Sequence, residues 1–92
     1  MSDLENKFFE ARQELIKSIR ERLSDAGGSA AVARRMGFTK SNLWYYLSET
    51  NFTVSNTEML TKISDTVATM ITEKKQAAIE AMQGAGEKLQ NA

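Results

Sequence analysis

The chain contains no proline, and its five glycines stand at only three places along 92 residues. Proline is the strongest helix breaker, and glycine is the next strongest. The glycines are Gly27, Gly28, Gly37, Gly84 and Gly86. Between these places, apolar residues recur at steps of three and four, which is the period of an amphipathic helix. The sequence therefore predicts an all-α protein without strands.

Three helices are predicted in the first half of the chain. The first spans Asp3 to Ala26 and ends at Gly27-Gly28, since glycine adopts the left-handed conformation that follows a helix. Two short helices follow, Ser29 to Met36 and Lys40 to about Ser48, capped by the hydroxyl groups of Ser29 and Thr39. The apolar face of the first helix comprises Leu4, Phe8, Ala11, Leu15, Ile19 and Leu23, widened by Phe9 and Ile16.

A long helix is predicted from Asn56 to Gln83. Ser55 and Glu58 form a capping box in front of it. Its apolar stripe is strong through residue 71, and beyond that point the stripe consists mainly of alanine. Gly84 and Gly86 are expected to end or fray the helix.

The length of this helix divides the chain. At 1.5 Å per residue it extends about 40 Å, which is too long to lie wholly against a three-helix core. We therefore expect a compact domain of four to five helices at 1–71. Residues 72–92 form a C-terminal helical extension and tail that serves self-association. A break in the helix near Thr72 is the alternative.

Composition excludes several classes of function. Cysteine and histidine are both absent, which excludes disulfides, ordinary zinc sites and catalytic dyads built on either residue. The carboxylates are scattered along helix surfaces, so we expect no enzyme and no cofactor. Twelve basic residues balance twelve acidic ones, so binding to nucleic acid needs a local basic patch. No apolar run approaches the roughly 20 residues of a membrane span, and no signal peptide opens the chain, which predicts a cytoplasmic protein without a membrane partner.

The stretch from Ser29 to Ser48 meets the requirements of a helix-turn-helix. The two helices of that motif cross closely, so the first needs a small residue, which Ala33 supplies. Four positions later, Gly37 supplies a turn residue that tolerates positive φ. Phe38 in the turn can fill the space between the helices. A plain pair of packed helices could show the same pattern. The residues expected at the buried contacts are Val32, Met36, Leu43 and Tyr46.

The pattern Ala33-x-x-x-Gly37-x-x-x-x-x-Leu43 resembles the helix-turn-helix of the phage Cro and lambda-repressor type of regulator. The segment Ser55 to Val67 is similar to the helix that follows the recognition helix in that family. Two features depart from the family: Ser29 stands where Gln is usual, and a minimal family domain lacks the long Ala-rich helix. The resemblance implies a sequence-specific DNA-binding transcriptional regulator, such as a repressor, of phage, plasmid or mobile-element type.

By this resemblance, the recognition helix at 39–48 lies in the major groove of double-stranded DNA. Lys40 can donate to guanine, Asn42 can pair with adenine, and Ser41 can serve either base. Trp44 and Tyr45 can instead contact thymine methyl groups, sugars or phosphates. Each of these residues could also be an ordinary surface or core residue. The expected DNA-binding residues are Ser29, Arg34, Arg35, Thr39, Lys40, Ser41, Asn42, Trp44 and Tyr45.

Two-fold symmetric DNA sites favour a homodimer or a higher oligomer. The long helix is expected to supply its interface, through Val67, Met70, Ile71, Ala78 and Met82. The alternative function is a protein-interaction adaptor, such as an antitoxin or an anti-factor, that uses Trp44, Tyr45 and the long helix. The two functions differ in whether the face of Arg34, Arg35 and Lys40 is free of that helix.

Overall fold

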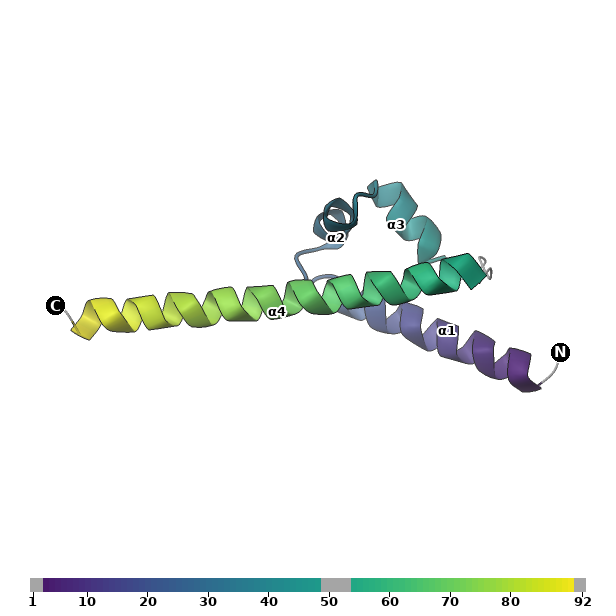
Figure 1. Cartoon of the computed structure of the whole chain (residues 1–92), viewed down its shortest axis with the longest axis horizontal. Coiled ribbons are helices and arrows are strands. Elements are labelled where there is room, and N and C mark those ends of the chain that lie inside the picture. The colour runs from purple at the N-terminus through teal and green to yellow at the C-terminus, as the bar shows by residue number, and fades with distance from the viewer. Residues whose placement is uncertain (1–2, 49–53, 91–92) are drawn as a thin grey trace.

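The computed structural model describes residues 3–48 and 54–90, and this part of the chain forms four helices and no strand. The helices are α1 (Asp3–Arg22), α2 (Ser29–Met36), α3 (Lys40–Tyr46) and α4 (Val54–Gln90). α1 and the α2–α3 pair contact different sides of the N-terminal half of α4, and the C-terminal half of α4 projects beyond them (Figure 1). The predictions of an all-α fold and a long C-terminal helix are confirmed for the described residues.

One apolar core joins the four helices. Val32 and Leu43 are buried in it as predicted, and Met36, Phe38 and Tyr46 are partly buried against it. Its buried apolar side chains are Ile16, Ile19, Leu23, Ala26, Val32, Ala33, Leu43, Leu47, Leu60, Ile63 and Val67.

α1 ends four residues earlier than the predicted boundary at Ala26. The regular helix stops at Arg22, and the chain turns through residues 23–27. The N–H of Gly28 donates to the carbonyl oxygen of Leu23 at 2.8 Å, and Gly27 has a φ of 110°. This six-to-one hydrogen bond around a left-handed glycine is a common helix ending. The glycine pair therefore ends the helical segment as expected, but a tightened turn replaces its last four residues.

The buried face of α1 is rotated from the predicted one. Arg12, Ile16 and Ile19 are buried, so the face is centred on Arg12 and Ile16 instead of Ala11 and Leu15. The N-terminal half of the helix diverges from α4 and has no covering element among the described residues (Figure 1). The predicted apolar face is therefore wrong in that half, where the exposed residues are Leu4, Phe8, Phe9 and Ala11.

A three-residue turn joins α2 to α3. α2 ends at Gly37 in the left-handed conformation predicted for it, with φ 74° and ψ 25°. The N–H of Phe38 donates to the carbonyl oxygen of Ala33 at 2.8 Å. Thr39 caps α3 as predicted, because its Oγ1 accepts the N–H of Asn42 at 3.1 Å. α3 then ends at Tyr46, two residues before the predicted end.

Two other predicted caps are wrong. Ser29 is the first residue of α2, and Gly28 occupies the cap position without a side-chain hydrogen bond. Ser55 lies inside the first turn of α4, because that helix begins at Val54. A capping residue precedes the first helical residue, whereas Ser29 and Ser55 both lie within their helices.

α4 is one helix of 37 residues. It continues through Thr72, Gly84 and Gly86, so the predicted end near Gln83 and the alternative break near Thr72 are both wrong. A Cβ atom added at either glycine would meet no atom within 4 Å. Both glycines therefore face open space, and no other described element packs against them.

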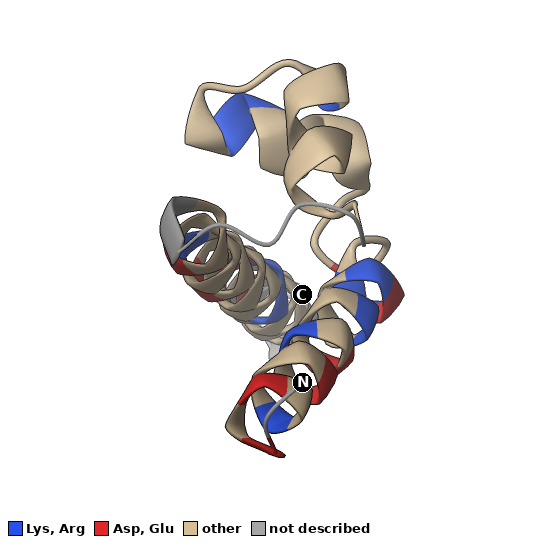
Figure 2. Ribbon diagram, turned by 90° about the vertical axis from the view of Figure 1, so that its right-hand side faces the viewer, with Lys and Arg blue, Asp and Glu red and all other residues tan. Residues whose placement is uncertain are grey.

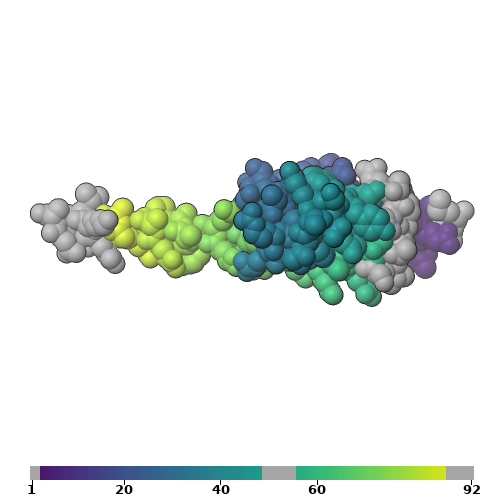
Figure 3. Space-filling model, turned by 90° about the horizontal axis from the view of Figure 1, so that it is seen from above, coloured from purple at the N-terminus to yellow at the C-terminus, as the bar shows by residue number. Residues whose placement is uncertain are grey.

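The molecule is elongated. Its extents are 68 × 28 × 16 Å and its radius of gyration is 17.7 Å, whereas a compact chain of this length would have about 12 Å. The difference arises from the C-terminal half of α4, which projects as a single helix from the body (Figure 3). No described helix is both long enough and apolar enough to cross a membrane.

Candidate nucleic-acid interface

α3 turns one face to the core and the opposite face outward. Leu43 and Leu47 are fully buried. At about 100° per residue, Ser41 and Tyr45 lie roughly 160–200° around the helix from Leu43, so they occupy the middle of the outer face. Trp44 and Asn42 flank them on the two sides, each about 100° from Leu43, and Lys40, in the first turn, lies about 60° from Leu43. All five of these residues are among those predicted to contact DNA, and all five side chains are exposed.

The two exposed aromatic rings of α3 are each held by a neighbour. The Tyr45 ring meets Tyr46 edge-on, with the centroids 5.4 Å apart, and Tyr46 stacks on Phe38 at 5.4 Å. The guanidinium carbon of Arg20 lies 5.6 Å from the centroid of the Trp44 ring, within reach of a cation–π interaction. The outer face therefore carries aromatic surface whose orientation is restrained from behind.

Two arginines of α1 reach the C-terminal end of α3. Arg20 Nη2 donates to the carbonyl oxygen of Leu47 at 3.1 Å, and Arg12 Nη2 donates to that of Ser48 at 3.4 Å. Carbonyl groups at the end of a helix lack partners within the helix and carry partial negative charge, so cationic donors stabilise them. Burial lowers the pKa of the Arg12 guanidinium, which is only 2% exposed.

Neither arginine was assigned a role from the sequence. On a helix, a charged residue beside an apolar stripe resembles a solvated one. The available signal was the spacing of Arg12, Ile16 and Ile19, which share one face. That spacing does not reveal which atoms Arg12 contacts.

The two basic residues of α2 differ in their surroundings. Arg34 is exposed. Arg35 forms a bidentate ion pair with Glu73 of α4, with Nη2–Oε1 at 2.5 Å and Nη1–Oε2 at 3.0 Å. The hydrogen bonds from Arg35 lower the pKa of the Glu73 carboxyl, and those same bonds raise the pKa of Arg35. The face of the three bases is therefore only partly free of the long helix, because Arg35 is neutralised by it.

Arg34 and Lys40 remain as the exposed bases of α2 and α3 without such an ion pair. Figure 2 shows basic and no acidic residues on this pair of helices, whereas both kinds occur on α1. Thr39 is exposed with its hydroxyl engaged in the cap, and Ser29 is half-buried at the start of α2. The predicted DNA residues thus belong to two helices and a turn that contain no acidic residue.

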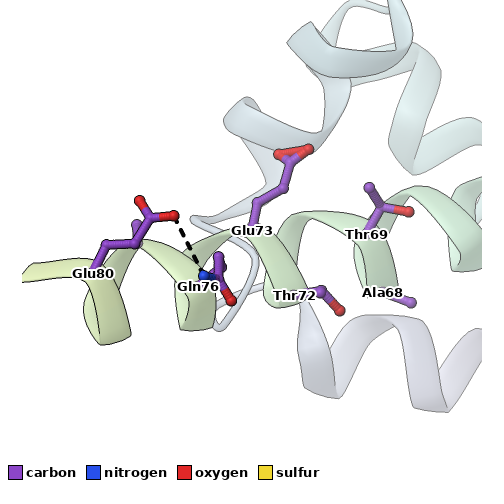
Figure 4. Close-up of a pocket in the computed structure, with 7 residues that line it drawn as sticks. Ala68, Thr69, Thr72, Glu73, Gln76 and Glu80 are labelled. Atoms are coloured by element: carbon purple, nitrogen blue, oxygen red, sulfur yellow. Dashed lines mark hydrogen bonds between the residues drawn. The ribbon is translucent and has the colours of Figure 1, made fainter. Parts of the chain in front are cut away.

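A groove on α4 offers no comparable chemistry. Every residue that lines it belongs to α4 (Figure 4). Glu73 points from it toward α2, and Gln76 Nε2 donates to Glu80 Oε1 at 3.3 Å. No cluster of three or more carboxylates in the described part of the chain could hold a metal ion.

The residues predicted for self-association separate into two groups. Val67 is fully buried in the core of its own chain, so its prediction as an interface residue is wrong. Met70 and Ile71 are partly buried against the same core. Ala78 and Met82 are exposed on the projecting part of α4, and Met82 is 73% exposed. The apolar periodicity of α4 includes both groups, so it does not show at which residue the helix leaves the core.

The chain matches no family model, no curated protein and no solved structure.

Proposed function

We propose that the protein is a sequence-specific DNA-binding regulator in which α2 and α3 act as a helix-turn-helix and the outer face of α3 enters the major groove. The observation that carries this proposal is the division of α3 into two faces. Leu43 and Leu47 anchor it in the core, while Ser41 and Tyr45 stand in the middle of an exposed face that no described element covers. A helix with one free polar and aromatic face fits the width of the major groove.

The connection between the helices supports the same function. A helix-turn-helix joins its helices by a turn of three or four residues that often contains glycine. Here the turn is Gly37, Phe38 and Thr39, with Gly37 left-handed and Thr39 capping the second helix. Ala33, the small residue that allows close approach, is 2% exposed.

The charge of this surface is modest, which favours action as a homodimer. Arg34 and Lys40 supply two exposed positive charges per chain for phosphate groups. A second copy would double the number of contacts and match the symmetry of a palindromic site. We propose that the projecting part of α4 joins the two copies, through the exposed residues Ala78 and Met82.

The stripe of α4 supports this dimer. The core positions Leu60, Ile63 and Val67 are followed on the same helix face by Lys74, and beyond it by residues 78, 81, 82 and 85, which are alanine or methionine. The projecting part of α4 is a single helix that contains two glycines, and such a helix is only marginally stable in water. Coverage by a second copy would remove that apolar face from water and stabilise the helix.

The test is selection of bound duplexes from a random DNA pool, followed by affinity measurements across salt concentrations. We expect enrichment of a palindromic site and a steep loss of affinity with salt, because phosphate contacts release counterions. Lys40→Ala or Ser41→Ala should cost about 1–3 kcal/mol at the selected site, and Arg34→Ala should weaken all sequences alike. Lys62→Ala, which removes an exposed charge from the far side of α4, is the matched control and should have no effect.

Two results would contradict the proposal. One is that no duplex is enriched at low or moderate salt. The other is that Lys62→Ala weakens binding as much as Lys40→Ala does. In the first case the adaptor function becomes the better interpretation, with Trp44 and Tyr45 as contacts for a protein partner.

A further inference from the structure

The outer face of α3 is unusual for a surface that reads base edges. Lys40 is its only charged residue. Its largest exposed side chains are Trp44 and Tyr45, at 41% and 58% exposure. Large aromatic side chains exposed together are costly unless a partner covers them. The partner that fits this face must therefore offer apolar surface as well as hydrogen-bonding groups.

Tyr45 is the aromatic residue at the middle of this face. It lies one helical turn from Ser41, and both point away from Leu43. Trp44 lies on the flank, where Arg20 of α1 covers part of its ring. A base edge at the bottom of the groove would meet Tyr45 first, and the rim of the groove would meet Trp44.

The Tyr45 ring is restrained before any partner arrives. It rests edge-on against Tyr46, which stacks on Phe38 in the turn, so a row of three rings runs from the turn to the outer face. Binding orders flexible side chains at a cost, and a side chain that is already ordered avoids part of it. This restraint distinguishes Tyr45 from an aromatic side chain that is merely exposed.

Only one group in the major groove matches an aromatic ring. Guanine, adenine and cytosine present hydrogen-bonding atoms there, whereas thymine also presents its C5-methyl group. We propose that Tyr45 contacts a thymine methyl group at one position of each half-site, so that the protein selects an A·T pair there. This assignment rests on the proposed function and adds the class of base pair that α3 recognises.

The experiment uses the selected duplex, in which each thymine is replaced singly by deoxyuridine. This replacement removes one methyl group and leaves the hydrogen-bonding atoms unchanged. Dissociation constants are measured for the unchanged protein, Tyr45→Phe, Tyr45→Ala and Trp44→Ala. Far-UV circular dichroism through thermal unfolding verifies that each variant is folded.

We expect one thymine per half-site whose replacement weakens binding of the unchanged protein by about three- to fivefold, the loss that corresponds to one buried methylene-sized group. Tyr45→Phe and Trp44→Ala should keep this ratio, because each retains an aromatic ring at position 45. Tyr45→Ala should bring the ratio close to one.

Three results would overturn the assignment. In the first, no thymine replacement changes the affinity of the unchanged protein. In the second, Tyr45→Ala keeps the thymine dependence, which would mean that another residue contacts the methyl group. In the third, Tyr45→Phe loses the dependence as Tyr45→Ala does, which would assign the contact to the hydroxyl group. If no duplex is selected at all, the proposed function itself fails and this assignment fails with it.

Discussion

Arginine side chains connect the helices where the apolar core ends. Arg20 donates to the end of α3, Arg22 Nη2 donates to Ser64 Oγ of α4 at 3.1 Å, and Arg35 pairs with Glu73. A guanidinium group carries five N–H donors on a long stem, so it can reach a second helix and satisfy more than one acceptor. In a small domain with a thin core, such links help to fix α1 against α3 and α4, and α2 against α4.

Arg12 should contribute more to stability than an exposed arginine. Arg12→Ala removes a buried donor from the carbonyl group of Ser48 and the packing of its stem, and we expect a loss of about 1–3 kcal/mol in the free energy of unfolding. Arg12→Lys keeps the charge but not the planar fork, and should recover part of the loss. Urea denaturation measures both values. Arg34→Ala, at an exposed position, is the control and should stay within about 0.5 kcal/mol of the unchanged protein. A loss for Arg12→Ala no larger than that of the control would contradict the role of the buried group.

The Arg35–Glu73 pair should show in an acid titration. Arg35 lowers the pKa of Glu73 below its ordinary value of 4.5. The stabilisation from the pair is therefore present above that ordinary value and is lost as the pH falls through the lowered pKa. Carbon-detected NMR of the Glu73 carboxyl should give a midpoint below 4.5 in the unchanged protein and a higher one in Arg35→Gln. Added salt should reduce the difference, since the pair is exposed. Equal midpoints in the two proteins would exclude the pair in solution.

At this scale the sequence predicts what is local. The helical period of α3 predicts that Tyr46 faces the core and that Trp44 and Tyr45 face outward. In the structure Tyr46 packs against the core and the other two are exposed. The sequence could not predict that Arg35 meets Glu73, because 38 residues separate them and the contact depends on how α2 packs against α4. The burial of Arg12 depends in the same way on where α3 ends.

Helix boundaries depend on the backbone conformation of single residues, and two glycines allow a controlled comparison. A Cβ atom would meet no neighbour at Gly37 or at Gly84, but Gly37 has a φ of 74° whereas Gly84 lies within α4. Gly37→Ala should destabilise the protein by about 1 kcal/mol or more, because an L-residue is strained in the left-handed region. Gly84→Ala should instead favour the helix by about 1 kcal/mol.

Urea denaturation measures the first effect, and the helical signal in far-UV circular dichroism measures the second. If Gly84→Ala leaves the helical signal unchanged, α4 does not continue as a helix through this position. If Gly37→Ala is neutral, the left-handed turn between α2 and α3 is not required.

Side-chain caps were predicted less well than glycine endings, for a physical reason. A left-handed glycine closes a helix through backbone geometry alone, and Gly27 and Gly37 both do so. A serine can cap a helix only if its own backbone is non-helical, as that of Thr39 is, with φ −78° and ψ 160°. α2 begins at Ser29 itself and α4 begins at Val54, so Ser29 and Ser55 are helical residues. The extent of α4 was underestimated because Gly84 and Gly86 do not adopt the left-handed conformation that ends a helix, although each lowers its stability.

Within residues 3–48 and 54–90, no other helix packs over the exposed apolar residues of the N-terminal half of α1 or over the projecting part of α4, which lie at opposite ends of the molecule (Figure 1). Helical periodicity predicts which residues form an apolar face. It does not predict whether another helix packs against that face. The stripe of α1 was therefore assigned to the core although Leu4 and Phe8 are exposed. This is the level at which the sequence predicts least.

The proposed dimer should depend on the apolar face of α4. Ala78→Glu and Met82→Glu place a charge on that face, and should shift the protein from dimer to monomer without unfolding the body, because both positions lie outside the core. Gln83→Glu introduces the same charge on the polar side and should leave the dimer intact. Light scattering coupled to size-exclusion chromatography measures the molar mass of each. A monomeric unchanged protein, or a dimer that survives both face substitutions, would contradict this interface.

The central claim is that the outer face of α3 binds duplex DNA, and NMR tests it most directly. Backbone amide shifts are followed while the selected duplex is added to the full chain. We predict the largest changes at Lys40, Ser41 and Tyr45, smaller changes near Arg34, and little change in the N-terminal half of α1. Changes confined to α1 or to the projecting part of α4, with α3 unaffected, would contradict the claim.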